Sequence, residues 1–373
     1  MSDGVDELFS LLRPAGGGVI VFSSGTQQLL EQQRRIYRCD DALNGEELVN
    51  QIDQRWRSAI ASVAKARLVL LGIPSDVGAG YQRGANLGPI AMRGELVRRA
   101  SFLYSDPRVV DLGDVRVIPQ LLEEEMLSEA QRRRSKAALY GDAESSLPVA
   151  PLDIAERALS LVRKLAPDAV PLVLGGDHSV SWPVVKTVAQ GCEHKLGILH
   201  FDAHTDLLAE RLGVQICFAT WAYHANLLVG RQQRLVQVGI RATRRTQAEW
   251  ESEHGVRQFW MAEVTRRSVD DIAEEIEELW RQAGVEGVYV SNDIDGTDPQ
   301  WARATGTPEP NGLLPATVKQ LIARICRKYP MWGSDLVEVA PPLAEAGGEP
   351  LRTLETAADY IELQARLSLD GVG

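Results

Sequence analysis

Three groups of histidine and aspartate residues follow apolar, strand-like segments of the chain. In order, they are His178, then Asp202, His204 and Asp206, and then Asp293 and Asp295. Side chains alternate between the two faces of extended backbone, so residues two apart within one group point to the same side. Imidazole and carboxylate groups bind divalent metal ions, and the sequence therefore predicts a metal site.

The number of ligands indicates more than one ion. Two histidines and four aspartates match two divalent ions that share bridging carboxylates, and such a pair lowers the pKa of a water enough to hold hydroxide at neutral pH. Hydroxide is the nucleophile of a hydrolase. Mn²⁺ is the expected metal because the ligands are oxygen-rich, although the set also allows Ni²⁺ or Co²⁺. Each aspartate alone could be a helix cap or turn residue, but three groups together favour the metal site.

The segments that carry these groups alternate with helical patterns. Apolar runs begin near residues 67, 109, 170, 196, 234 and 285, and amphipathic patterns cover 154–165 and 269–282. Apolar strands separated by helices predict a parallel sheet that is covered on both faces. We therefore expect a three-layer α/β/α fold with a mostly parallel, doubly wound sheet, in which ligands gather at the carboxyl ends of the strands.

Two further segments do not follow this alternation. Residues 1–66 read as an N-terminal arm in which Ser24 or Thr26 caps a polar helix, followed by a catalytic domain over 67–373. Residues 119–148 are highly charged and read as an inserted helix or surface excursion.

Composition narrows the possible partners and compartment. The chain has 373 residues, with 40 Lys and Arg against 51 Asp and Glu, a net charge of −11. This charge disfavours nucleic acid and acidic membranes. The four cysteines have no paired spacing, the N-terminus lacks a signal-peptide pattern, and no G-x-G-x-x-G indicates a dinucleotide site. We expect a cytoplasmic protein with no nucleic-acid or membrane partner.

At these motifs the sequence resembles the ureohydrolase family, which includes arginases, agmatinases and guanidinobutyrases. The resemblance runs from about Leu68 to the C-terminus. Beside the metal motifs, it includes the segments Gly72–Pro74, Arg83–Ala85, Gly88–Arg93, Asp111–Asp114, Val238–Arg241, Gly306–Pro310 and Asp335–Glu338. It implies an arginase-like fold, two metal ions, a homo-oligomer (trimer or hexamer) and agmatinase-like hydrolysis of a small guanidino compound to urea and an amine.

The resemblance also implies a role for individual residues. One ion would be held by His178, Asp202, Asp206 and Asp293, and the other by His204, Asp202, Asp293 and Asp295. Glu338 would bind the guanidinium of the substrate, a planar cation that suits a carboxylate, unless it instead pairs with Arg241. Asp206 would pass a proton to the departing nitrogen.

The sequence departs from the family pattern near the expected pocket. Phe218 stands where relatives carry a histidine, and because an aromatic ring cannot transfer protons, water, His224 or His200 would have to replace it. Phe218, Trp221 and Trp301 would make the pocket aromatic, unless each belongs to the core.

Several functions remain open on this evidence. Arginase activity is disfavoured because Leu208 stands where arginases read the substrate carboxylate with an asparagine. Agmatine is the default substrate, with guanidine, an alkylguanidine and 4-guanidinobutyrate as alternatives. A metal-binding subunit without catalytic activity is the alternative from a different functional class.

Overall fold

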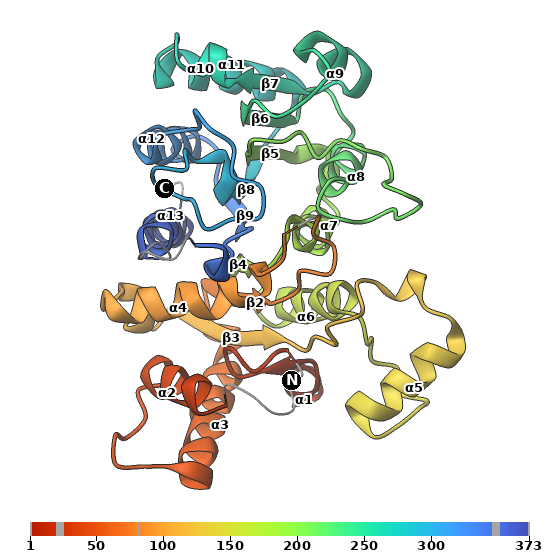
Figure 1. Cartoon of the computed structure of the whole chain (residues 1–373), viewed down its shortest axis with the longest axis vertical. Helices are drawn as coiled ribbons and strands as arrows, with labels where there is room; N and C mark the ends of the chain where they lie inside the picture. The colour runs from red at the N-terminus through yellow and green to blue at the C-terminus, as the bar shows by residue number, and fades with distance from the viewer. Residues whose placement is uncertain (1, 20–25, 81, 345–350, 372–373) are drawn as a thin grey trace.

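A computed structural model shows a nine-stranded sheet between two layers of helices (Figure 1). The structure describes residues 2–19, 26–80, 82–344 and 351–371. The strands are β1 Leu12–Arg13, β2 Leu68–Ile73, β3 Val109–Val115, β4 Val170–Gly175, β5 Leu196–Phe201, β6 Leu235–Ile240, β7 Arg257–Trp260, β8 Gly287–Asp293 and β9 Met331–Val337.

The order of strands in the sheet is β1-β3-β2-β4-β9-β8-β5-β6-β7. Every pairing is parallel except that of β1 with β3. The predicted three-layer, mostly parallel α/β fold is therefore confirmed. Strand β9, the last in sequence, lies near the centre of the sheet between β4 and β8.

Helices cover both faces of the sheet. Figure 1 shows α4, α12 and α13 on one face and α6, α7 and α8 on the other. The helices are α1 Ser2–Leu11, α2 Thr26–Ile36, α3 Gly45–Ala61, α4 Gly88–Arg98, α5 Glu129–Tyr140, α6 Pro151–Leu165, α7 Ser181–Ala189, α8 Trp221–Leu228, α9 Gln247–His254, α10 Met261–Val264, α11 Val269–Ala283, α12 Pro315–Cys326 and α13 Leu351–Asp370. Among the described residues, no helix combines the length and hydropathy that crossing a bilayer requires.

Helix α11 shows how local sequence sets an element. Ser268 and Asp271 form a reciprocal capping box at its start, and Gly284 ends it with φ +72°. Ile276 and Trp280 lie one turn apart and are buried. The capping residues therefore set the two ends of the helix, and its apolar side chains face the core.

The N-terminal residues pack against the sheet of their own chain. Helix α3 lies against β3, where the Trp56 indole donates to the Leu112 carbonyl at 2.9 Å. The Gly16 amide donates to Asp114 at 2.6 Å, which fixes the segment after β1. Thr26 is the first residue of α2, while Ser24 lies outside the described residues. The proposed boundary at residue 66 stays a prediction.

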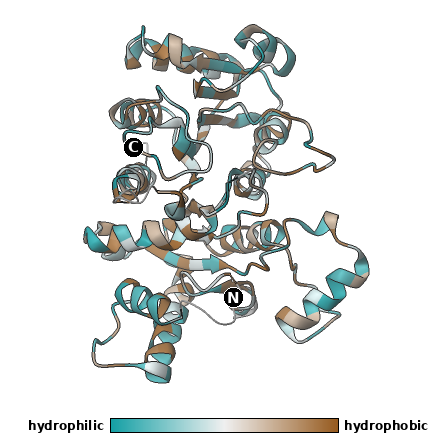
Figure 2. Ribbon diagram, in the orientation of Figure 1, coloured by the Kyte–Doolittle hydropathy of each residue, from teal (hydrophilic) through white to brown (hydrophobic). Residues whose placement is uncertain are grey.

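Helix α5 is the helix of the charged segment 119–148. A capping box of Ser128 and Gln131 starts it, Gly141 ends it, and none of its residues is buried. It stands away from the sheet in Figure 1, and its ribbon is mostly hydrophilic in Figure 2. The limits of the insertion itself stay a prediction.

Candidate metal centre

The metal-binding residue types converge because their strands are neighbours. His178 comes soon after β4, Asp202 directly follows β5, Asp293 ends β8 and Glu338 directly follows β9. These strands are adjacent in the order β4-β9-β8-β5, and all run parallel. Their carboxyl ends therefore meet at one edge, where open α/β sheets bind ligands.

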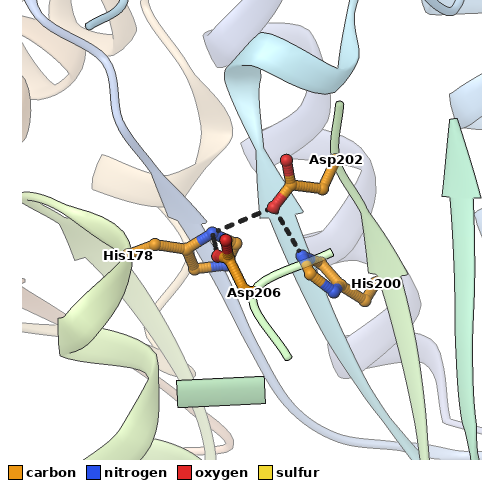
Figure 3. Close-up of side chains that lie close together, drawn as sticks. All are labelled: His178, His200, Asp202 and Asp206. Carbon is orange, nitrogen blue, oxygen red and sulfur yellow. Dashed lines mark hydrogen bonds and ion pairs between the residues drawn. The ribbon is translucent and has the colours of Figure 1, made fainter. Parts of the chain in front are cut away.

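His178 is surrounded by three carboxylates. Its Nδ1 lies 3.0 Å from Asp293 Oδ2, 3.1 Å from Asp206 Oδ2 and 3.3 Å from Asp202 Oδ2. Figure 3 shows Asp202 and Asp206 pointing toward this ring. The other ring nitrogen, Nε2, lies 3.0 Å from the Ser291 hydroxyl.

Ser291 determines which nitrogen of His178 is free. The Ser291 hydroxyl donates to Asp335 at 2.9 Å, so it accepts the proton of His178 Nε2. His178 Nδ1 is then left with a lone pair that faces three carboxylate oxygens. Only a cation or a proton at this point would make the arrangement stable. This buried nitrogen and its oxygen neighbours fit a divalent metal ion.

A second histidine completes a neighbouring group. His204 Nδ1 lies 3.1 Å from Asp295 Oδ2 and 3.4 Å from Asp202 Oδ1. Thr307 donates to Asp295 Oδ2 at 2.8 Å and orients that carboxylate. Candidate ligand atoms of Asp202, His204 and Asp295 lie within 4.8 Å of one another. Asp202 thus presents Oδ2 to His178 and Oδ1 to His204.

The concentration of charge shifts the pKa values of these groups. Burial and the negative charges of Asp295 and Asp202 hold the pKa of Asp293 well above its usual value. For His204, burial opposes protonation, but the charge of Asp295 and the other carboxylate contacts outweigh it and raise the pKa to about 12. These shifts arise because carboxylates are crowded together, and divalent cations would neutralise this charge.

Asp206 and Glu338 have strained backbones, with φ of +50° and +62°. A non-glycine residue in this region costs free energy, so surrounding contacts must hold it. The Trp221 indole donates to Asp206 Oδ2 at 3.0 Å. The His178 amide donates to Glu338 Oε1 at 2.8 Å, and the Glu338 amide donates to the Gly176 carbonyl at 2.8 Å.

Glu338 is a buried carboxylate without an ion pair to lysine or arginine among the described residues. Burial and the charge of Asp177 raise its pKa well above the usual value. Arg241, its possible structural partner, donates instead to backbone carbonyls, including those of Asp295 and Glu309. No lysine or arginine forms an ion pair with Glu338 in the part of the chain that the structure describes. A planar cation from solution would suit this position.

Trp221 supports the site from behind and does not line an open pocket. It is fully buried, and its ring stacks on His178 with centroids 4.6 Å apart. Trp221 therefore does not line the aromatic pocket that the sequence predicts. Phe218 lies closer to the surface, beneath Arg211 at 4.8 Å and against Gly80, where a Cβ would come within 2.9 Å of the ring. Trp301 packs with Arg352 near α13.

His224 lies apart from the two histidine groups. Its Nε2 is 3.1 Å from the Ala209 carbonyl and 3.2 Å from the Gln215 carbonyl. The loop after β5 thus engages this ring nitrogen and gives His224 a loop contact, and the catalytic role of His224 stays a prediction. His200 is the histidine that does join the cluster, with Nε2 2.8 Å from Asp202 Oδ2 (Figure 3).

Sequence reasoning missed the polar residues behind these groups. Ser291 and Asp335 orient His178, and the Tyr289 hydroxyl donates to the same Asp335 carboxylate. Ser291 lies two residues before Asp293 and Asp335 lies three residues before Glu338, and this closeness to candidate site residues was the available signal.

Known proteins resemble the chain over most of its length. The sequence model of the Arginase family matches residues 66–363. The chain belongs to the arginase family. It is 30% identical to a guanidinobutyrase of Pseudomonas aeruginosa over 295 residues, covering 75% of this chain and 81% of that protein. It is 33% identical to a mitochondrial agmatinase of Gallus gallus over 293 residues, covering 75% and 76%.

A solved structure agrees with this membership. Proclavaminate amidino hydrolase from Streptomyces clavuligerus superimposes with a TM-score of 0.61 at 28% identity, covering 80% of this chain and 92% of that one. The family and the enzyme class predicted from sequence, a ureohydrolase-type hydrolase, are confirmed. The clustered histidines and aspartates are consistent with the metal centre of such an enzyme.

Proposed function

We propose that this protein is a binuclear metal hydrolase that cleaves a guanidino C–N bond and releases urea and an amine. The observation that carries this proposal is the position of Asp202. Its two carboxylate oxygens face the Nδ1 atoms of two different histidines, His178 and His204. A carboxylate placed in this way can bridge two ions, and one ion alone would not require the second histidine.

The contacts of the two histidines support the ligand sets, and the family resemblance implies Asp293 as a second bridge. His178, Asp206 and Asp293 would hold the first ion, His204 and Asp295 the second, and Asp202 would bridge them, with Asp293 as the second bridge. Mn²⁺ is the proposed metal and Ni²⁺ the alternative. Two such ions activate water and stabilise negative charge at the guanidino carbon.

Glu338 and Asp206 would act on the substrate. The buried Glu338 carboxylate would accept hydrogen bonds from the guanidinium, which neutralises a charge that burial disfavours. Asp206 binds Trp221 through Oδ2. Its Oδ1 would take a proton from the attacking water and pass it to the leaving nitrogen. Because Phe218 cannot do so, Asp206 would be the proton carrier.

Agmatine is the proposed substrate, and Glu309 supports it. The Glu309 carboxylate lies 3.9 Å from His204 Nε2, and its side chain is 39% exposed. This places a negative group beside the second histidine, where it would attract the ammonium end of a diamine-like substrate.

A guanidino acid such as 4-guanidinobutyrate is the second candidate. Arg211 is exposed and lies over Phe218, on the loop that follows β5. Its guanidinium would bind a carboxylate. Guanidine and alkylguanidines would use neither charged group and are disfavoured for that reason.

Urea release tests the proposal. Purified protein loaded with Mn²⁺ or Ni²⁺ is assayed with agmatine, 4-guanidinobutyrate, arginine, guanidine and methylguanidine. We expect turnover of agmatine that Asp202→Ala and Asp293→Ala abolish and that Glu309→Gln weakens. Turnover of 4-guanidinobutyrate that Arg211→Gln weakens would select the second candidate. Bound metal without turnover of any compound would contradict the proposal and favour a non-catalytic subunit.

Assembly and location also remain proposals. A trimer or hexamer is proposed because large apolar side chains are exposed on the loop after β5 and on α8, namely Leu208, Leu212 and Leu227. Light scattering of the purified protein tests this. A cytoplasmic location without nucleic-acid or membrane partners stays a prediction, supported by the net charge of −11.

A further inference from the structure

A row of polar side chains crosses the apolar sheet behind the candidate metal centre. His200 on β5 pairs in register with Gln237 on β6, and Gln237 pairs in register with Gln258 on β7. All are buried. Buried polar groups in a sheet are stable only when they bond one another, so this row acts as one unit.

The hydrogen bonds along the row have one possible direction. The Trp260 indole N–H, which can only donate, lies 2.9 Å from Gln258 Oε1. Gln258 Nε2 must then donate to Gln237 Oε1, at 2.8 Å. This leaves Gln237 Nε2 facing His200 Nδ1, at 2.9 Å. An amide nitrogen only donates, so His200 Nδ1 accepts and carries no proton.

An independent contact gives the same direction. Gln237 Nε2 also donates to the Thr205 carbonyl at 2.6 Å. Turning the Gln237 amide over would place its oxygen against the Thr205 carbonyl, and it would place its nitrogen against Gln258 Nε2, so that two donors face each other. The side-chain orientation is therefore fixed from both ends of the amide.

We propose that Gln237 and Gln258 are positioning residues for the metal centre. They keep the proton of His200 on Nε2 alone, where it is donated to Asp202 Oδ2 at 2.8 Å. This hydrogen bond fixes the Asp202 carboxylate, which faces both His178 and His204. The effect of this arrangement on metal binding rests on the proposed function. The position of the proton on His200 is argued from the hydrogen bonds alone.

Gln258 acts only through Gln237 and His200, whereas Gln237 also holds the backbone between His204 and Asp206 through the Thr205 carbonyl. Partners that orient a metal ligand from behind typically change metal affinity by about 10–100-fold when mutated. Gln237→Glu would replace the donor at His200 Nδ1 with an acceptor and so draw a proton onto that nitrogen. Gln237→Met would remove the donor without adding an acceptor.

The test uses ¹⁵N NMR of histidine-labelled full-length protein without metal, together with Mn²⁺ titration followed by electron paramagnetic resonance. We expect an unprotonated Nδ1 for His200 in the natural protein and in Gln237→Met, and a protonated Nδ1 in Gln237→Glu. Both variants should bind Mn²⁺ about 10–100-fold more weakly. If Gln237→Glu does not fold, Gln258→Glu replaces it. This substitution reverses the direction of the same hydrogen bonds from a position nearer the sheet edge.

Gln364→Met is the matched control. Gln364 is buried in α13, and its side-chain amide has no hydrogen-bond partner among the described residues. This variant should keep the Mn²⁺ affinity and His200 signals of the natural protein. A protonated His200 Nδ1 in the natural protein would overturn the proposal, as would glutamate variants with unchanged signals and affinity. Absence of urea release with these results intact would reject the proposed function alone.

Discussion

Replacing Trp221 with phenylalanine tests whether an indole holds the strained aspartate in place. Asp206 has φ +50°, and the Trp221 N–H donates to its Oδ2 at 3.0 Å. Phenylalanine keeps an aromatic ring against His178, which lies 4.6 Å away, but it removes this donor. Asp206 would then lose the contact that fixes its carboxylate.

The size of the effect follows from the lost bond. A hydrogen bond to a charged group contributes about 1.5–3 kcal/mol. If this free energy serves to position Asp206, metal binding should weaken by about 10- to 150-fold, because about 1.4 kcal/mol corresponds to a factor of ten. The smaller ring also leaves a cavity that lowers the free energy of unfolding.

Trp250→Phe provides the matched comparison. Trp250 is 5% exposed and donates its indole N–H to Thr243 at 3.0 Å, in α9 rather than at the metal centre. Both variants should unfold at lower denaturant concentration. Mn²⁺ affinity and the rate of urea release should fall only in Trp221→Phe. Equal affinity and turnover in the two variants would refute the positioning of Asp206 by Trp221.

Three further outcomes are expected. Because the pKa of His204 is raised to about 12, binding of Mn²⁺ should displace a proton, and Mn²⁺ affinity should rise with pH. Calorimetry in buffers of different ionisation enthalpy measures this proton release, and its absence would contradict the prediction. Arg93→Met breaks the buried pair with Asp114 and should lower the free energy of unfolding by about 3–5 kcal/mol, as measured by denaturant titration. Arg108→Met breaks an exposed pair with Asp106 and should lower it far less. Burial raises the pKa of Asp153 from 3.8 to about 6, so the folded state binds more protons than the unfolded state between these pH values. The free energy of unfolding therefore falls as pH rises through this range, and Asp153→Asn should remove that part of its pH dependence.

The sequence predicts the fold well because the signals for it are local. Apolar runs and helical periodicity locate most strands and crossover helices, and parallel strands bring their ends together without further information. Strand β7 escapes this reasoning because Arg257 and Gln258 interrupt its apolar pattern. Helix α3 escapes it because its spaced apolar residues lie in a polar segment, and only the sheet shows what they pack against.

The site is predictable only in part because side-chain direction and strand register are not local. The candidate ligands could be chosen by residue type and spacing. Trp221 could not be assigned to the rear of the site, since its position in sequence does not show which side of Asp206 the ring occupies. Gln237 and Gln258 gain a role only when β5, β6 and β7 place them opposite His200.

The central position of β9 has a consequence for how the chain is made. This strand joins β4 to β8, so the two halves of the sheet have no shared ladder until the last strand in sequence is available. The bond between His178 and Glu338 likewise spans 160 residues. During synthesis, the emerging chain would expose the unpaired edges of β4 and β8, which are sites for aggregation. Metal binding would therefore require the complete chain. A polypeptide on a ribosome stalled before residue 331 should depend on chaperones and should not retain metal.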